Sequence, residues 1–132
     1  MVNRMAEIIA FRSNEVPKLN YDEIHILLSE LGTQQGLRVF ERVLFEVSDK
    51  LCQLEMAVYE KDMQVARRIA GSLKSLCPQV GLDSVCDVAC QFIEIIDSKD
   101  LAIIPVICQR MVCLGEASLF QLAELPRVLA DQ

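Results

Sequence analysis

Apolar residues recur every three or four positions along most of this chain, which is the spacing of one face of an α-helix. The clearest example lies between residues 34 and 60, where the apolar positions are Leu37, Phe40, Leu44, Val47, Leu51, Leu54 and Val58. A helix of that length spans roughly 40 Å. A single long coiled coil would continue this pattern, but the pattern stops near Lys61 and Asp62, and shorter ones follow.

A short helix is predicted before the long one, over about residues 21–31. Asn20 precedes it and Glu23 follows three residues later, a spacing typical of a capped helix start. Gly32 is predicted to end this helix, and Thr33 to cap the next one.

A third helix is predicted after Asp62. Its buried stripe is predicted to consist of Val65, Ile69, Leu73, Leu76 and Val80. Pro78 removes a backbone donor, so we expect a kink there. Gly81 is predicted to end the helix, and Asp83 or Ser84 to cap the following one.

Two more helices complete the pattern. The apolar face of the fourth is Leu82, Val85, Ala89, Phe92 and Ile96. The fifth begins near Pro105, and its apolar face is Ile104, Ile107, Met111, Leu114 and Leu122. Amphipathic helices joined by short turns pack most simply as an antiparallel up-down bundle. The predicted fold is therefore all-α, a four-helix bundle over residues 20–126 that includes the additional short N-terminal helix. Residues 1–19 form an N-terminal extension and residues 127–132 a C-terminal tail.

Composition and charge narrow the function. Hydrophobic residues make up 52% of the 132 residues and charged residues 24%, which excludes a disordered chain. The formal net charge of −6 disfavours binding to nucleic acid or to an anionic membrane. The longest apolar run, residues 101–108, is too short to cross a bilayer, and the N-terminus lacks the features of a signal peptide. We therefore expect a cytoplasmic protein.

The cysteines do not form a recognisable metal motif. The six cysteines form no CxxC pair, and no histidine lies near them in the sequence. They are Cys52, Cys77, Cys86, Cys90, Cys108 and Cys113. Cys86 and Cys90 share one helical face, but two thiols make an incomplete site. We expect reduced, buried cysteines that act as small hydrophobic residues, and neither a metal nor a cofactor.

The end of the third helix and the turn after it resemble the signature of histidine phosphotransfer (HPt) domains. That signature reads His-x-Leu-Lys-Gly, with a glycine seven residues after the lysine and an apolar residue four positions further on. Leu73, Lys74, Gly81 and Val85 match it. The order of helices over about residues 17–126 is also similar. The resemblance implies a four-helix bundle in which the phospho-accepting position lies exposed midway along the third helix.

The phospho-accepting histidine itself is absent. Gly71 stands at its position, and Ser75 replaces the small glycine after the lysine. Phosphoryl relay needs an imidazole nitrogen as nucleophile. No base lies within sequence reach of Ser72, and His25, the one histidine, belongs to the first helix. No other catalytic motif is present, so we expect a chain that carries no phosphate and is not an enzyme.

The face opposite the buried stripe of the third helix is the predicted docking face: Gln64, Arg67, Arg68, Gly71, Lys74, Ser75 and Pro78. The resemblance implies that it binds the receiver domain of a response regulator or a histidine kinase. Cations here complement an acidic partner and steer its association, although they are also what a solvated helix surface carries.

A second hypothesis is a structural or oligomerisation bundle without a signalling partner. Phe45, Cys52 and Met56 add an apolar flank beside the main seam of the long helix. That flank could meet the N-terminal extension or a second subunit in a homodimer.

Overall fold

The computed structural model describes residues 15–124, and every regular element in that range is a helix. The elements are α2 (Tyr21–Leu31), α3 (Thr33–Tyr59), α4 (Met63–Leu76), the short 3-10 helix η1 (Cys77–Val80), α5 (Asp83–Asp97), the short 3-10 helix η2 (Leu101–Ile103) and α6 (Ile104–Ala123). The prediction of an all-α chain is confirmed, and the predicted helices are found with their ends shifted by a few residues. Residues 1–14 of the predicted extension and the predicted tail, residues 127–132, lie outside the described residues.

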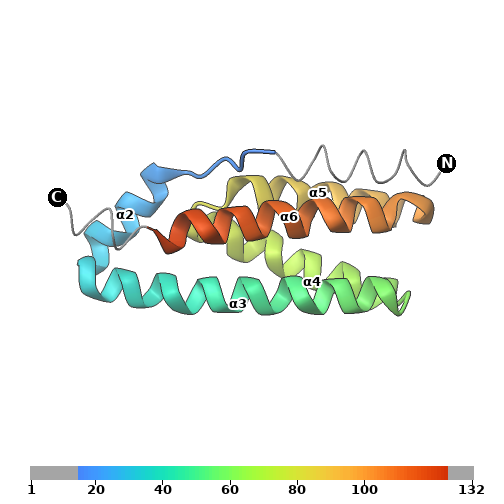
Figure 1. Ribbon diagram of the computed structural model, residues 1–132, viewed down its shortest axis with the longest axis horizontal. Helices are drawn as coiled ribbons and strands as arrows, with labels where there is room; N and C mark the ends of the chain where they lie inside the picture. Colours follow the sequence, from blue (N-terminus) through green and yellow to red (C-terminus); the bar gives the residue numbers. More distant parts are fainter. Residues whose placement is uncertain (1–14, 125–132) are drawn as a thin grey trace.

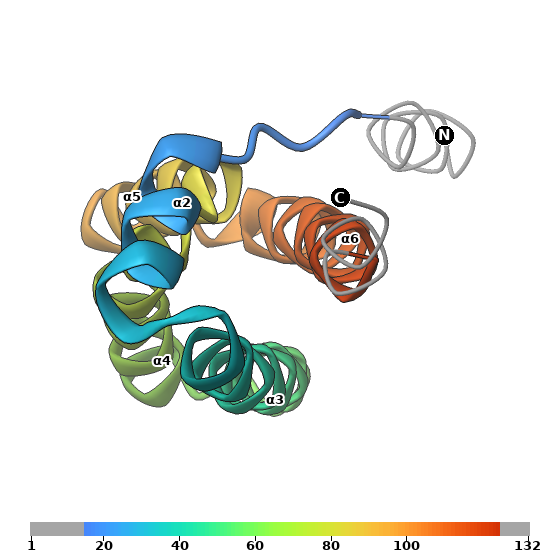
Figure 2. The same cartoon turned by 90° about the vertical axis from the view of Figure 1, so that its left-hand side faces the viewer.

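The longest helices lie side by side as a helical bundle, and the chain runs through them in alternating directions (Figure 1). α3 contacts α4 and α6, and α5 contacts the same two helices. Figure 2 shows these helices nearly end-on. α2 contacts α3 and η1, at the end of the bundle where α4 passes into α5.

The core lies between α3, α4, α5 and α6. Its largest fully buried side chains include Phe92, Leu54, Leu73, Leu82, Ile104 and Met111. Burying a side chain of this size stabilises the fold by about 1.5–3 kcal/mol. In the predicted seam of α3, Phe40, Val47, Leu51 and Leu54 are buried. Leu37 and Val58 at its two ends, and Leu44 within it, are half-buried.

The buried stripe of α4 differs from the prediction. Ile69, Leu73 and Val80 are buried as expected, but Val65 and Leu76 are only half-buried. The positions that complete the stripe are small residues: Ala66, Ala70 and Cys77. Small side chains let neighbouring helices approach closely, and they were missed because the predicted stripe was built from large apolar residues.

The predicted kink at Pro78 is wrong, because α4 ends at Leu76 before the proline is reached. Pro78 lies at the start of η1, where its missing N–H removes no helical hydrogen bond. Gly81 ends η1 in the left-handed conformation, with φ of 76°. A Cβ atom at this position would lie 2.6 Å from the carbonyl oxygen of Asn20, so both the backbone and the close approach of α2 require glycine.

Of the predicted helix caps, the one at Asn20 is confirmed. Its side chain accepts a hydrogen bond of 3.2 Å from the backbone N–H of Glu23. The cap predicted at Thr33 is wrong, because Thr33 is the first residue of α3 and Gly32 occupies the cap position.

The predicted cap of α5 is also wrong. Leu82 is the cap residue and supplies no side-chain hydrogen bond, and Asp83 is the first helical residue. The hydroxyl of Ser84 instead accepts a hydrogen bond from the backbone N–H of Lys18. Ser84 therefore fastens the segment before α2 to the start of α5.

Among the described residues, one segment is long and apolar enough to cross a membrane by length and composition. It comprises η2 and α6, residues Leu101–Ala123. Of its most apolar window, 44% is buried inside the protein, where α6 contacts α3 and α5. Core helices of folded domains meet the same criterion, so this finding is weak evidence for a membrane.

Candidate docking site on α4

The predicted docking face lies on α4 and the first residues of η1. Gln64, Arg67, Arg68, Lys74 and Ser75 are exposed, and Gly71 and Pro78 are half-buried. α4 begins at Asp62, whose side chain accepts a hydrogen bond of 3.2 Å from the backbone N–H of Val65. Lys74 lies in the last turn, where a cation is favoured by the helix dipole.

The structure divides these residues between two flanks of α4. On the α5 flank, Arg67 binds Asp97 through hydrogen bonds of 2.8 Å from Nε and 3.0 Å from Nη2. The carbonyl oxygen of Lys74 accepts a hydrogen bond of 3.5 Å from the Sγ of Cys86 on α5. Arg67 and Lys74, seven residues apart, therefore share this flank.

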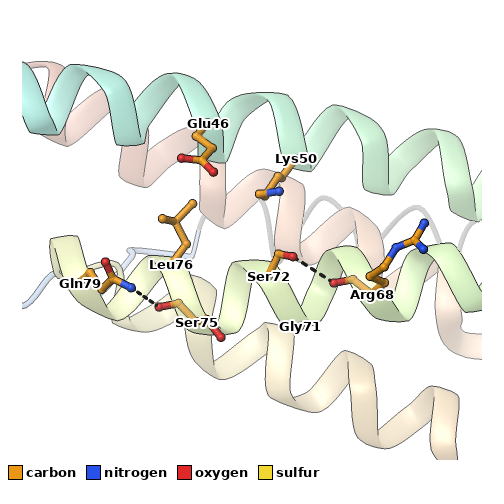
Figure 3. Close-up of a pocket in the computed structure, with 8 residues that line it drawn as sticks. All are labelled: Glu46, Lys50, Arg68, Gly71, Ser72, Ser75, Leu76 and Gln79. Carbon is orange, nitrogen blue, oxygen red and sulfur yellow. Dashed lines mark hydrogen bonds between the residues drawn. The ribbon is translucent and has the colours of Figure 1, made fainter.

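On the α3 flank, an open groove of about 480 Å³ separates α3 from α4 (Figure 3). Its lining consists of Glu46, Lys50, Arg68, Gly71, Ser72, Ser75, Leu76 and Gln79. Figure 3 shows Glu46 and Lys50 extending from α3 toward α4. The groove brings together three of the predicted docking residues, and the other four do not line it.

Charge in the groove is opposite in sign to that of the whole chain. Lys50 and Arg68 contribute two positive charges and Glu46 one negative charge, whereas the chain carries −6. Within residues 15–124, no ion pair joins Glu46 to either cation. The groove is therefore a locally basic surface on an acidic protein, which favours an acidic partner.

Two hydrogen bonds between residues four positions apart lie along the α4 and η1 side of the groove. The Ser72 hydroxyl donates to the carbonyl of Arg68 at 3.3 Å, and the Gln79 amide donates to the carbonyl of Ser75 at 3.1 Å. Because the Ser72 proton points to a backbone carbonyl, the hydroxyl is not paired with Glu46 as a nucleophile with its base would be.

Gly71 lies between the two flanks of α4, with open space at the position that a side chain would occupy. A Cβ atom at this position would have no neighbouring atom within 4 Å, other than those of its own helix turn. Glycine inside a helix costs about 0.5–1 kcal/mol relative to alanine. Close packing within the described residues does not account for this glycine.

The structure corrects the predicted charge of the docking face at one position, Arg67. The hydrogen bond from Arg67 holds the pKa of the Asp97 carboxyl below its usual value. The same hydrogen bond raises the pKa of Arg67. The positive charge of Arg67 is thus balanced by Asp97, and Arg68 and Lys74 remain as the cations of this face.

None of the six cysteines forms a disulfide bond in the structure. The prediction that they are buried holds only for Cys77 and Cys108. Burial raises the pKa of each of these two thiols to about 12. Cys52 is exposed, and Cys86, Cys90 and Cys113 are half-buried. In residues 15–124 no three Cys, His, Asp or Glu side chains are grouped so that they could hold a metal ion.

His25 is exposed on α2 and does not line the groove. The groove residues that sequence reasoning missed are Glu46, Lys50, Ser72, Leu76 and Gln79. Glu46 and Lys50 are four positions apart beside the main seam of α3, which places them on one helical face. That spacing was visible in the sequence, but which helix they would face was not.

Comparisons with protein-family models, with curated proteins and with solved structures found no match. The resemblance to HPt domains therefore rests on the residues named above and on where they lie.

Proposed function

We propose that this chain is an HPt-like module of phosphorelay (two-component) signal transduction, which binds a receiver domain or a histidine kinase without carrying phosphate. In this proposal the four longest helices are the up-down bundle of the HPt family and α4 is its motif helix. The observation that carries it is the position of Gly71. It lies on an open surface between Arg68 and Lys74, where the family would carry its acceptor.

The positions of the motif residues support this register. Leu73 and Val85 are fully buried and Lys74 is exposed. Gly81 has the left-handed backbone that favours glycine. Each residue that matches the motif therefore has a structural role that its type suits.

The chemistry of the site supports binding without phosphotransfer. Gly71 has no side chain that could accept a phosphoryl group, and the Ser72 hydroxyl is bonded to a backbone carbonyl. A chain of this kind, a pseudo-phosphotransferase, would act by occupying or tethering its partner. We place this interaction in the cytoplasm, with no nucleic acid and no membrane involved.

Charge reversal on α4 tests the proposal. Receiver domains of the source organism are purified one by one and titrated with the wild-type chain and with Arg68→Glu and Lys74→Glu. We expect at least one receiver to bind, and each variant to weaken its affinity by about tenfold or more. Arg42→Glu is the matched control, since Arg42 is exposed on α3 and does not line the groove. Failure of every receiver and kinase to bind would contradict the proposal, as would an equal loss in the control.

One observation favours the alternative, a structural bundle that forms a homodimer. Phe45, Met56 and Tyr59 are 76%, 57% and 84% exposed on α3. Together with Cys52, they recur at spacings of seven, four and three residues, which places them on one helical face. Exposed apolar patches often mark association sites. Sedimentation of the wild type and of Phe45→Glu separates the hypotheses, because only a homodimer built on this face would dissociate in the variant.

A further inference from the structure

A second pocket lies at the end of the bundle away from α2, where α3 passes into α4 and α5 passes into α6 (Figure 1). Its volume is about 400 Å³, within the range of about 300–1,000 Å³ that is typical of small-molecule sites. We call it the end pocket, and these residues line it: Val58, Lys61, Met63, Leu101, Ala102, Ile104 and Pro105. Its described lining shares no residue with the groove between α3 and α4, so it is a separate candidate site.

The lining of the end pocket is apolar apart from one cation. Among the described residues that line it, Lys61 is the only one with a charged or polar side chain. Ile104 is 1% exposed and belongs to the core, whereas Leu101 is 52% exposed. Small-molecule sites typically combine an apolar lining with a few polar groups that orient the ligand. The end pocket therefore suits an apolar molecule that carries one polar group.

The charge of Lys61 is not paired within the described part of the protein. In residues 15–124 no carboxylate forms an ion pair with its ammonium group, although Glu60 and Asp62 are its neighbours in the sequence. The carboxylate of Asp62 caps α4 instead, where it accepts a hydrogen bond of 3.2 Å from the backbone N–H of Val65. Apolar walls exclude water, which strengthens the attraction between opposite charges. An unpaired cation beside such walls favours an anionic group on the ligand.

The backbone of Lys61 is fixed by the end of α3. Its N–H donates to the carbonyl of Val58 at 3.1 Å, and the N–H of Asp62 donates to the carbonyl of Ala57 at 2.9 Å. Lys61 has a left-handed conformation, with φ of 60°, which favours glycine. The side chain of Lys61 therefore starts from a fixed point beside the pocket, and glycine at this position would keep the turn.

Lys99 has the same backbone arrangement at the end of α5 but does not line the end pocket. Its φ is 62°, its N–H donates to the carbonyl of Ile96 at 3.0 Å, and the N–H of Asp100 donates to the carbonyl of Ile95 at 3.3 Å. A helix end alone therefore accepts lysine in this conformation. What distinguishes Lys61 is its place in an apolar lining, and Lys99 is its matched control.

The carboxylates nearby limit the charge of the ligand. Glu60 and Asp62 flank Lys61, and Asp100 precedes Leu101 of the lining. All three acidic residues are exposed. One ammonium group can balance one carboxylate, whereas a dianion such as a phosphate monoester would be repelled by the carboxylates around it. The local charge therefore favours a ligand with a single negative charge.

We propose that the end pocket binds a small amphipathic carboxylate. The apolar chain of the ligand lies among Met63, Leu101 and Ile104, and its carboxylate pairs with the ammonium group of Lys61. This inference does not depend on the proposed signalling function, because the end pocket shares no residue with the docking face of α4.

Titration of the full-length chain with octanoate, followed by NMR of ¹³C-labelled isoleucine and methionine methyl groups, tests the proposal. We expect saturable shifts of the Ile104 and Met63 signals, and no shift of Ile24, which lies on α2 at the other end of the bundle. Octylammonium, which has the same chain and the opposite charge, should bind at least about tenfold more weakly. Octyl phosphate should bind no more tightly than octanoate.

Replacement of lysine by glycine separates binding from folding. Lys61→Gly relieves the left-handed conformation of a residue with a side chain, so the midpoint of urea unfolding should rise. The variant should nevertheless bind octanoate about tenfold more weakly, while its affinity for uncharged 1-octanol should change by less than about twofold. Lys99→Gly should raise the midpoint in the same way and keep the wild-type affinity for octanoate.

Absence of a saturable shift with octanoate would overturn the proposal. Equal affinities for octanoate and octylammonium would do the same, because the apolar walls alone would then account for binding. Unchanged octanoate affinity in Lys61→Gly, or an equal loss in Lys99→Gly, would show that Lys61 does not hold the carboxylate and would also overturn it.

Discussion

Arg67 of α4 and Asp97 of α5 are joined by two parallel hydrogen bonds, of 2.8 and 3.0 Å, although they lie 30 residues apart in the sequence. About half of each side chain is exposed, at 51% and 52%. Exposed pairs contribute little to stability because water and salt screen them. The consequence of this pair is electrostatic, because it balances one of the cations that the docking face would otherwise present.

Removing the carboxylate of Asp97 should therefore strengthen partner binding. In Asp97→Asn the charge of Arg67 is no longer balanced, so we expect affinity for an acidic receiver domain to rise by about two- to fivefold. The midpoint of urea unfolding should barely move. Titration of wild type and variant at two salt concentrations checks this, since an electrostatic gain must shrink at high salt. Unchanged or weaker binding would mean that Arg67 does not face the partner.

The same pair has a defined pH dependence. The pKa of Asp97 is lowered in the folded chain, so its small contribution to stability is present above the ordinary carboxyl value of 3.8. It is lost as pH falls through the lower value of the folded state. Near neutral pH the contribution of this pair to stability should therefore not change with pH.

Replacing each of two glycines by alanine should change the stability of the protein in opposite directions. Gly71→Ala places its Cβ in open space within a helix, so the free energy of unfolding should rise by about 0.5–1 kcal/mol. Gly81→Ala is the matched control. It imposes a positive φ on alanine and a contact with the Asn20 carbonyl, and should lower stability by about 1–3 kcal/mol. Urea unfolding measures both, and a Gly71→Ala protein that unfolds earlier than wild type would contradict an exposed helical Gly71.

Gly71→His should fold as well as the wild type. The new side chain would enter the same open space, three residues before Lys74, where the family carries its acceptor. Thermal unfolding followed by circular dichroism checks this expectation. A marked loss of helical signal would contradict the position assigned to residue 71.

The two buried thiols should make the fold sensitive to alkaline pH. Burial raises the pKa of Cys77 and Cys108 from 9.0 to about 12, with smaller effects from nearby Cys86 and Glu55 respectively. Above pH 9 the unfolded chain loses these protons and the folded chain keeps them. Stability should therefore fall with rising pH, by up to about 1.4 kcal/mol per thiol for each pH unit.

Unfolding curves at pH 8, 9 and 10 measure this slope. Cys77→Ala should be less stable overall because it leaves a cavity, but its stability should decline less steeply between pH 9 and 10. Cys52→Ala, at an exposed position, should keep the wild-type slope. Equal slopes in all three proteins would show that the buried thiols ionise as readily as exposed ones.

The chain should not acquire an acid-labile phosphoryl group from a phosphorylated receiver domain. Gly71 offers no nucleophile, and Ser72 is hydrogen-bonded to the Arg68 carbonyl. Labelling with radioactive phosphate, followed by acid treatment, measures this directly. A stoichiometric acid-labile label that disappears in His25→Ala would assign a phosphate-carrying role to His25.

Sequence patterns predicted the elements whose signals are local. The α3 seam was visible because large apolar residues recur every three or four positions, and the α2 cap because Asn20 and Glu23 lie within one turn. The stripe of α4 was misplaced because Ala66 and Ala70 gain their importance only when helices pack against them. The end of α4 at Leu76 was missed because a proline can either kink a helix or follow its end, and the local sequence at Pro78 does not distinguish the two.

The site was predictable only in part for the same reason. Helical periodicity placed Arg68, Gly71 and Lys74 on the outward side of α4. It could not show that Lys50 of α3 would join Arg68 in a groove, nor that Asp97 would pair with Arg67. Both facts depend on how far α4 lies from each neighbour, which no local pattern encodes.

The most direct test of the docking face is its hydrogen-exchange footprint with the receiver domain that binds the chain. We predict slower exchange at residues 68–79 of α4 and η1 and around Lys50 of α3, with no change at the exposed stripe of Phe45 and Tyr59. Slowing confined to that α3 stripe, or no footprint on α4 with any receiver or kinase domain, would contradict the assignment of α4 as a signalling surface.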